Sequence, residues 1–293
     1  MFRLFSNFSH SASLQGIALA LISTGLFVLV GVLVRILSKD IDLFQILFLR
    51  QVVFIAILIP AMWTSFDELL APRKKKLHAL RIIGAFLALY LGFVTVSNLP
   101  LADATVLGFT QVLFVALIAK IFLSESVGKL RLLTILVGFI GVILVVQPRF
   151  DDASFLYSMM GLIGAFGAAV AVVCVRQMSK TESRTLLLSY QAIFVGLIAF
   201  VPSLFAWQWP SWSQWLLLIL VGVISSLAQW IGVTAYKLAQ ANVVANVEYA
   251  KIIYSLILGY FLFSEEPNTV ALVGALIIIS SGVLPLFASL YKK

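Results

Sequence analysis

The stretch GFVTVSNLPLADATVLGFTQVLFVALIAKIFLSE, residues 92–125, decides the fold, because the chain contains a second version of it, GVTAYKLAQANVVANVEYAKIIYSLILGYFLFSE, at residues 232–265. The two segments align without a gap at an offset of 140 residues, and both end in Ser-Glu. Matches between apolar segments are weak one by one, but the same offset also places Gln51 over Gln191. A nearly constant offset along most of the chain indicates a duplication.

The composition shows what kind of protein was duplicated. Hydrophobic residues make up 62% of the 293 residues and charged residues only 11%, whereas a soluble domain carries about 25% charged residues. Apolar runs of about 20 residues, long enough to cross a bilayer as helices, follow one another with short polar breaks. They predict an all-α membrane protein with ten transmembrane helices, at residues 14–37, 43–63, 77–98, 102–123, 130–146, 155–175, 185–205, 214–236, 241–263 and 270–290.

These ten spans divide into two predicted units of five, residues 1–148 and 149–293. Because five is an odd number, the second unit must enter the membrane in the opposite sense to the first, so the units are inverted repeats. Inverted repeats favour alternating access, in which a shared central site is exposed first to one side and then to the other.

The Lys and Arg residues set the predicted orientation. Most of them fall in loops on one side when the N-terminus is placed in the cytoplasm, as the run at 73–76 does. Both termini are therefore predicted to be cytoplasmic, in a multi-pass protein of the inner (plasma) membrane. The net charge of +8 is scattered over short loops, so the expected partner is the lipid bilayer and not a nucleic acid. Four tryptophans between residues 206 and 215 are typical of anchors at the opposite interface.

A family pattern appears in these residues. The chain resembles the drug/metabolite transporter superfamily, and within it the EamA-type transporters, in its ten spans, its duplication, and the glutamate that follows the fourth helix of each repeat, here in 123–125 (LSE) and 263–265 (FSE). The stretches 247–249 (VEY) and 256–263 (LILGYFLF) are similar to the ninth-helix signature of such exporters. The resemblance implies a central cavity lined chiefly by helices 1, 3, 4, 6, 8 and 9, for amino acids, nucleotide-like compounds, vitamins or other metabolites. Lys251 departs from the family pattern, in which this position is often neutral.

Glu248 and Lys251 are the sharpest candidates for a binding site. Both fall near the middle of the ninth predicted helix, and a spacing of three residues places them on one face. Charges at this depth cost roughly 2.5–3.5 kcal/mol, so they usually face a cavity or a partner. One interpretation is an ion pair that compensates itself; the other is a transport pathway, with Lys251 for a carboxylate or phosphate and Glu248 for an amine or a proton. Their repeat counterparts, Gly108 and Gln111, favour the pathway, and Gln111 becomes its neutral partner.

Further candidates lie at similar depth. Arg50 is about eight residues inside the second span, too deep to reach water, so its partner must come from another helix or from a ligand. Aromatic and amide side chains could complete a pocket by stacking and by replacing hydrogen bonds to water. These are Tyr90, Tyr190, Gln191, Gln229, Trp230, Asn246 and Tyr254. The pairs Gly164 with Ala168 and Gly167 with Ala171 predict close contact between helices.

The function that fits best is secondary transport of a small organic metabolite, an amino acid or a related zwitterionic or anionic compound, in the export direction, with Glu248 as a possible proton site. An exchanger for organic phosphates or nucleotide-like solutes is the first alternative. An intramembrane enzyme is the rival from another class, but only His10 and His78 occur, both outside the centre of a span, and there is no phosphate-binding P-loop. We expect no cofactor and no metal.

Overall fold

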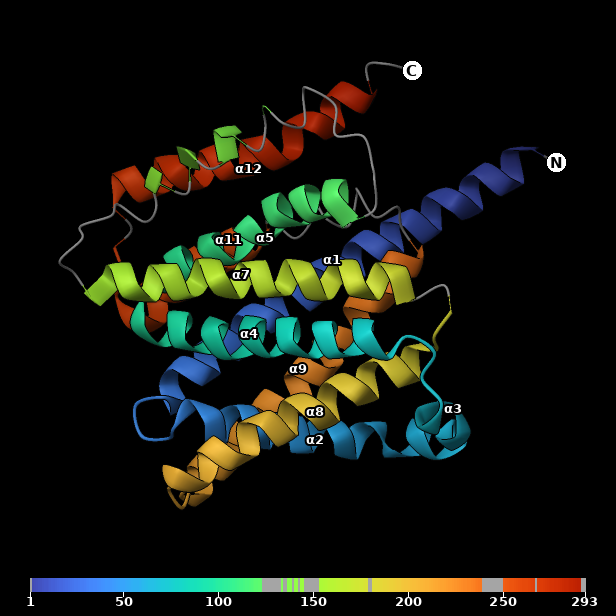
Figure 1. The fold of residues 1–293 in the computed structure, drawn as a ribbon. Coiled ribbons are helices and arrows are strands. Elements are labelled where there is room, and N and C mark those ends of the chain that lie inside the picture. Colours follow the sequence, from blue (N-terminus) through green and yellow to red (C-terminus); the bar gives the residue numbers. More distant parts are fainter. Residues whose placement is uncertain are drawn as a thin grey trace.

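The computed structural model describes residues 2–122, 133, 136–138, 140, 141, 143, 144, 153–178, 181–238, 250–266 and 268–290. Within these residues the chain is helical and contains no strand (Figure 1). The helices are α1 (Phe2–Leu37), α2 (Leu43–Thr64), α3 (Phe66–Leu70), α4 (Lys75–Asn98), α5 (Leu101–Phe122), α7 (Ala153–Met178), α8 (Arg184–Phe205), α9 (Trp212–Leu238), α11 (Ala250–Phe263) and α12 (Thr269–Leu290).

The predicted membrane class is confirmed. Six helices of the described part are long and apolar enough to cross a bilayer, at Leu14–Leu37, Leu43–Thr64, Lys75–Asn98, Ala153–Val175, Arg184–Phe205 and Trp212–Gly232. Three shorter apolar helices, Leu101–Val115, Ala250–Phe263 and Thr269–Ser281, coincide with further predicted spans. The predicted span 130–146 lies largely outside the described residues, so the count of ten stays a prediction.

Helix starts and the membrane-facing surface follow from local chemistry. Asp42 caps α2 by accepting a hydrogen bond from Phe44 N at 2.8 Å, and Ser183 caps α8 by accepting one from Leu186 N at 3.3 Å. Trp209 and Trp212 are 84% and 91% exposed, as expected of interface anchors. The short helix α3 was not predicted, because five residues are too few to show a hydrophobic period.

The helices pack in pairs. α4 lies along α7, α1 along α9, and α2 along α8, while α5 contacts both α7 and α11 (Figure 1). A Cβ on Gly84 would lie 2.6 Å from Gly167 O, and one on Gly167 would lie 2.8 Å from Gly84 O. The predicted close contact at Gly167 is therefore confirmed, and it brings α4 and α7 together along one wall of the central cavity.

Candidate functional site

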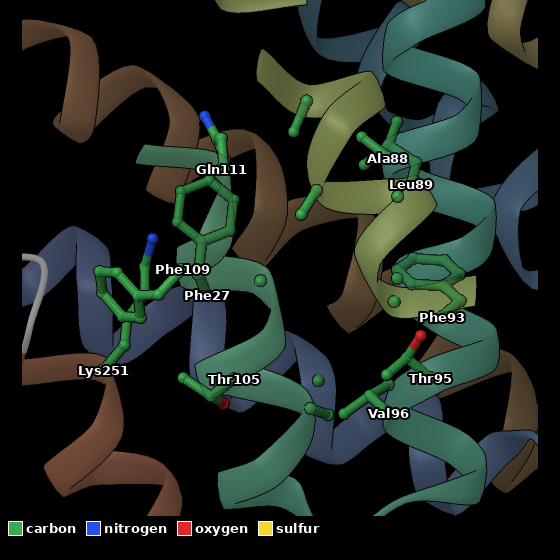
Figure 2. Close-up of a pocket in the computed structure, with 18 of the residues that line it drawn as sticks. Phe27, Ala88, Leu89, Phe93, Thr95, Val96, Thr105, Phe109, Gln111 and Lys251 are labelled. Carbon is green, nitrogen blue, oxygen red and sulfur yellow. The ribbon is translucent and has the colours of Figure 1, made fainter. Parts of the chain in front are cut away.

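A cavity of about 330 Å³ lies among α1, α4, α5 and α7, and it also receives one side chain each from α2 and α11 (Figure 2). This volume falls in the range of small-molecule sites, about 300–1,000 Å³. The resemblance implied helices 1, 3, 4, 6, 8 and 9 as the lining. The structure agrees except at the eighth span, α9, none of whose described side chains lines the cavity, whereas α2 contributes Arg50.

Small residues create much of this space. Gly92, Gly108, Gly161 and Gly164 line the cavity, together with several alanines. A Cβ on Gly92 or Gly108 would meet no atom within 4 Å, so at these two positions the missing side chain is itself part of the cavity. Gly108 is the repeat counterpart of Glu248, and it leaves the wall of α5 open where the other repeat carries an acid.

Lys251 enters the cavity from the first turn of α11. Its Nζ lies 5.7 Å from the centre of the Phe27 ring and 5.9 Å from the centre of the Phe109 ring, within the range of a cation–π contact. Figure 2 shows Lys251, Phe27, Phe109 and Gln111 on one side of the cavity and Phe93 on the other. A cation held between two rings near an amide can attract an anionic group.

Arg50 reaches the same cavity from α2, with only 3% of its surface exposed. Its Nε donates a hydrogen bond to Ser225 Oγ of α9 at 3.0 Å. Its Nη1 is buried and has no hydrogen-bond partner among the described residues. The partner from another helix that was predicted for Arg50 is therefore Ser225. Nη1 still requires a hydrogen-bond acceptor.

Arg50, Gln111 and Lys251 are thus the sequence candidates that the structure brings together. Glu248 and Asn246 lie outside the described residues. Tyr90 is stacked on Phe44, with ring centres 4.0 Å apart, and is not among the residues that line the cavity.

The candidates on α9 and the rest of α11 lie elsewhere. Tyr254 packs against α1, where a Cβ on Gly25 would lie 3.6 Å from its ring. Trp230 is 63% exposed. Gln229 is partly buried, and its Oε1 has no hydrogen-bond partner within the described part of the chain.

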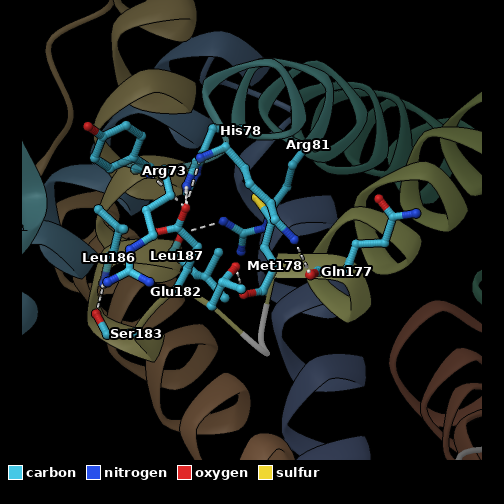
Figure 3. Close-up of polar contacts among 12 residues, drawn as sticks. Arg73, His78, Arg81, Gln177, Met178, Glu182, Ser183, Leu186 and Leu187 are labelled. Carbon is cyan, nitrogen blue, oxygen red and sulfur yellow. Dashed lines mark hydrogen bonds and ion pairs between the residues drawn. The ribbon is translucent and has the colours of Figure 1, made fainter. Parts of the chain in front are cut away.

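Sequence reasoning missed a buried polar cluster around Glu182 (Figure 3). Glu182 Oε1 accepts hydrogen bonds from the backbone N–H groups of Arg73 and Lys74, both at 3.0 Å. The same oxygen lies 3.6 Å from His78 Nε2, and both side chains are 3% exposed. The cluster joins the loop before α4 to the loop before α8. In the sequence these residues are charged or polar and lie in or next to predicted loops, where such residues are expected to orient the protein. No local sequence pattern indicates that they are buried.

Two further polar candidates belong to this junction and not to the cavity. Gln191 Oε1 accepts a hydrogen bond from Arg81 Nη2 at 2.9 Å, and Arg81 Nη1 donates to Leu187 O. Tyr190 donates from its hydroxyl to Leu69 O at 2.8 Å. These contacts hold α4 and α3 to α8.

Comparison with known proteins gives consistent results. The model of the EamA-like transporter family matches the chain twice, at residues 14–147 and 155–286. The pseudopaline exporter CntI of Pseudomonas aeruginosa (strain UCBPP-PA14) is 26% identical over 273 residues, which cover 90% of this chain and 93% of the exporter. The S-adenosylmethionine uptake transporter of Rickettsia bellii is 25% identical, covering 88% of both chains.

The riboflavin transporter of Vibrio cholerae is 30% identical over 206 residues, which cover 70% of this chain and 69% of the transporter. One solved crystal structure superimposes with a TM-score of 0.68 at 16% identity, covering 97% of this chain and 99% of the other. At that identity the superposition shows the shared fold alone.

Proposed function

The chain belongs to the EamA-like transporter family, and we propose that it is a secondary transporter that carries a small zwitterionic or anionic metabolite, such as an amino acid, through the central cavity. Its relatives are named as transporters of small molecules and not as enzymes. The observation that carries the proposal is the presence of Lys251 and Arg50 in one cavity of metabolite size. Cations within membrane-spanning helices are costly unless something compensates them, and an anionic solute does so.

The architecture we propose has ten spans in two inverted repeats, residues 1–148 and 149–293. We propose that the protein lies in the inner (plasma) membrane with both termini in the cytoplasm. The packing supports the two repeats. Under the proposed repeat, α4 corresponds to α9, and α7 corresponds to α1. The contact between α4 and α7 therefore has its counterpart in the contact between α9 and α1, and both contacts occur. The double match to the family supports the same division.

The direction and coupling we propose are export by alternating access, with Glu248 as a site that exchanges a proton during the cycle. The similarity to the pseudopaline exporter over 90% of this chain supports the direction. The alternative is exchange of organic phosphates or nucleotide-like solutes, which two cations in the lining also favour. Exchange requires solute on both sides of the membrane, whereas proton-coupled transport requires solute on one side and a pH gradient.

The test is transport by the purified protein in proteoliposomes. The panel contains radiolabelled amino acids, organic phosphates, nucleotide sugars and vitamins, each measured with and without unlabelled solute inside. Transport of at least one anionic or zwitterionic solute, above liposomes without protein, is expected. Transport of cationic or neutral solutes alone would overturn the proposal, and a signal that appears only with internal solute would select exchange.

A further inference from the structure

The two carboxylate oxygens of Glu265 are held by two different helices of the other half. Arg35 Nη1, near the end of α1, donates to Glu265 Oε1. The backbone N–H of Leu101, the first residue of α5, donates to Glu265 Oε2 at 2.8 Å. Glu265 itself follows α11. One side chain therefore joins the end of α11 to α1 and α5 by two charge-assisted hydrogen bonds.

The backbone conformation after α11 places the Glu265 carboxylate next to α1 and α5. Ser264 has a φ of 53°, a left-handed conformation that costs energy in a residue other than glycine. Glu265 N then donates back to Gly259 O at 3.1 Å. A Cβ on Gly259 would lie 2.6 Å from Glu265 Oε2, so the carboxylate occupies space that only glycine leaves open. The Arg35 guanidinium also lies 4.3 Å from the centre of the Phe263 ring.

This contact lies directly beyond one end of the cavity. Leu101 and Gly31 both line the cavity, and Leu101 is only 1% exposed. A Cβ on Gly31 would lie 3.7 Å from Leu101 Cδ1, so these two residues lie close together at that end. Arg35 is one helical turn further along α1.

We propose that Glu265 is a latch that closes this end of the cavity, and that it must release Arg35 and the Leu101 N–H before a solute can pass on this side. Alternating access requires each end of the site to close in turn, and a contact between elements of the two halves breaks when the halves move apart. The glutamate of the Ser-Glu motif at 264–265 would then close one end of the cavity, a role that the sequence alone does not indicate.

The side of the membrane follows from a neighbouring contact. Gln214 Nε2, in the first turn of α9, donates to Asp40 Oδ2 in the loop after α1 at 3.3 Å. The latch and the loop that contains Ser211 are therefore on the same side, which is the outer side in the proposed function. This part of the inference rests on that proposed orientation.

The test measures access to the cavity and needs no substrate. Cys174 is the only cysteine of the chain, so Cys174→Ala with Thr105→Cys gives one reporter thiol in the cavity lining. A charged, membrane-impermeant maleimide is added to intact cells, and the labelling rate is compared among the unlatched variants Glu265→Gln and Arg35→Ala and the control Glu266→Gln. Glu266 is adjacent in sequence, carries the same charge and is exposed. Ser211→Cys, in the same cysteine-free background, reports the orientation.

We expect labelling of Thr105→Cys to become about tenfold faster in Glu265→Gln and in Arg35→Ala, since a hydrogen bond to a charged group shifts an equilibrium by about this factor, and to stay unchanged in Glu266→Gln. Equal rates in all variants would overturn the latch, as would an increase that Glu266→Gln shares. A merely structural role would lower the yield of folded protein without changing access. If Ser211→Cys is labelled only in inverted vesicles, the proposed orientation fails, and the same comparison made from that side still decides the latch.

Discussion

Arg50 Nε lies 3.0 Å from Ser225 Oγ, and this bond between α2 and α9 fixes how the guanidinium enters the cavity. Ser225 in turn donates to Gly222 O, one turn earlier in its own helix, at 3.1 Å. Nη1 is buried and has no partner among the described residues, and Arg50 lines the cavity, so we expect the guanidinium to donate to a solute acceptor there.

Replacement of Arg50 by lysine should weaken solute binding although the charge is kept. Lysine cannot hold Ser225 and present a second N–H group at the same time. We expect the dissociation constant of the transported solute to rise about tenfold or more, measured by titration calorimetry on the purified protein. Arg73→Lys, at an exposed loop position, is the control and should bind as wild type. Unchanged affinity in Arg50→Lys would contradict the role.

Two glycine substitutions should separate packing from cavity space. Gly84→Ala places a Cβ 2.6 Å from Gly167 O, so α4 and α7 must move apart, whereas Gly108→Ala meets nothing within 4 Å. We expect Gly84→Ala to destabilise the fold by about 1–3 kcal/mol and Gly108→Ala to leave it unchanged, measured by thermal denaturation in detergent. Equal melting temperatures for the two variants would show that α4 and α7 do not depend on this contact.

A larger side chain at position 108 should block the site without unfolding the protein. Gly108→Leu fills space that is part of the cavity, so binding should be lost while the melting temperature stays near that of wild type. The measurements are solute binding and thermal denaturation of the same sample. Retained binding would place the solute outside this cavity.

Loss of Glu182 should affect stability and not access to the cavity. Glu182→Ala removes the acceptor of the partly buried Arg73 and Lys74 N–H groups, and donors left unsatisfied away from water cost about 1–3 kcal/mol. We expect a lower melting temperature than for Glu68→Ala, which changes an exposed carboxylate. A melting temperature equal to that of Glu68→Ala would contradict a structural role for this cluster.

Much of the fold could be predicted because its signals are local. Span length and hydrophobicity identify the helices. The five residues of α3 carry too little pattern to be seen. The contact of Gly84 with Gly167 was anticipated only from the α7 side, although Gly84, Ala88 and Gly92 show the same four-residue spacing in α4.

The site could be predicted only in part. Charge or symmetry at a given depth marked Arg50, Gln111 and Lys251, and all three line the cavity, while their part in binding stays a prediction. The stacking of Tyr90 on Phe44 and the outward position of Trp230 depend on how each helix is rotated, which weak periodicity in an apolar helix does not fix. The roles of Glu182 and Glu265 depend on contacts between the halves, and the sequence alone does not specify them.

The most direct test of the central claim concerns Lys251 and the charge of the solute. Binding of the transported solute that gives the largest signal in the panel is compared with binding of an analogue in which the carboxylate is replaced by an uncharged carboxamide, or the phosphate by a hydroxyl group. The comparison is made in wild type, in Lys251→Gln and in the exposed-site control Lys76→Gln. Wild type and Lys76→Gln should prefer the solute with the carboxylate or phosphate by about tenfold or more, and Lys251→Gln should lose that preference. An undiminished preference in Lys251→Gln would contradict the account.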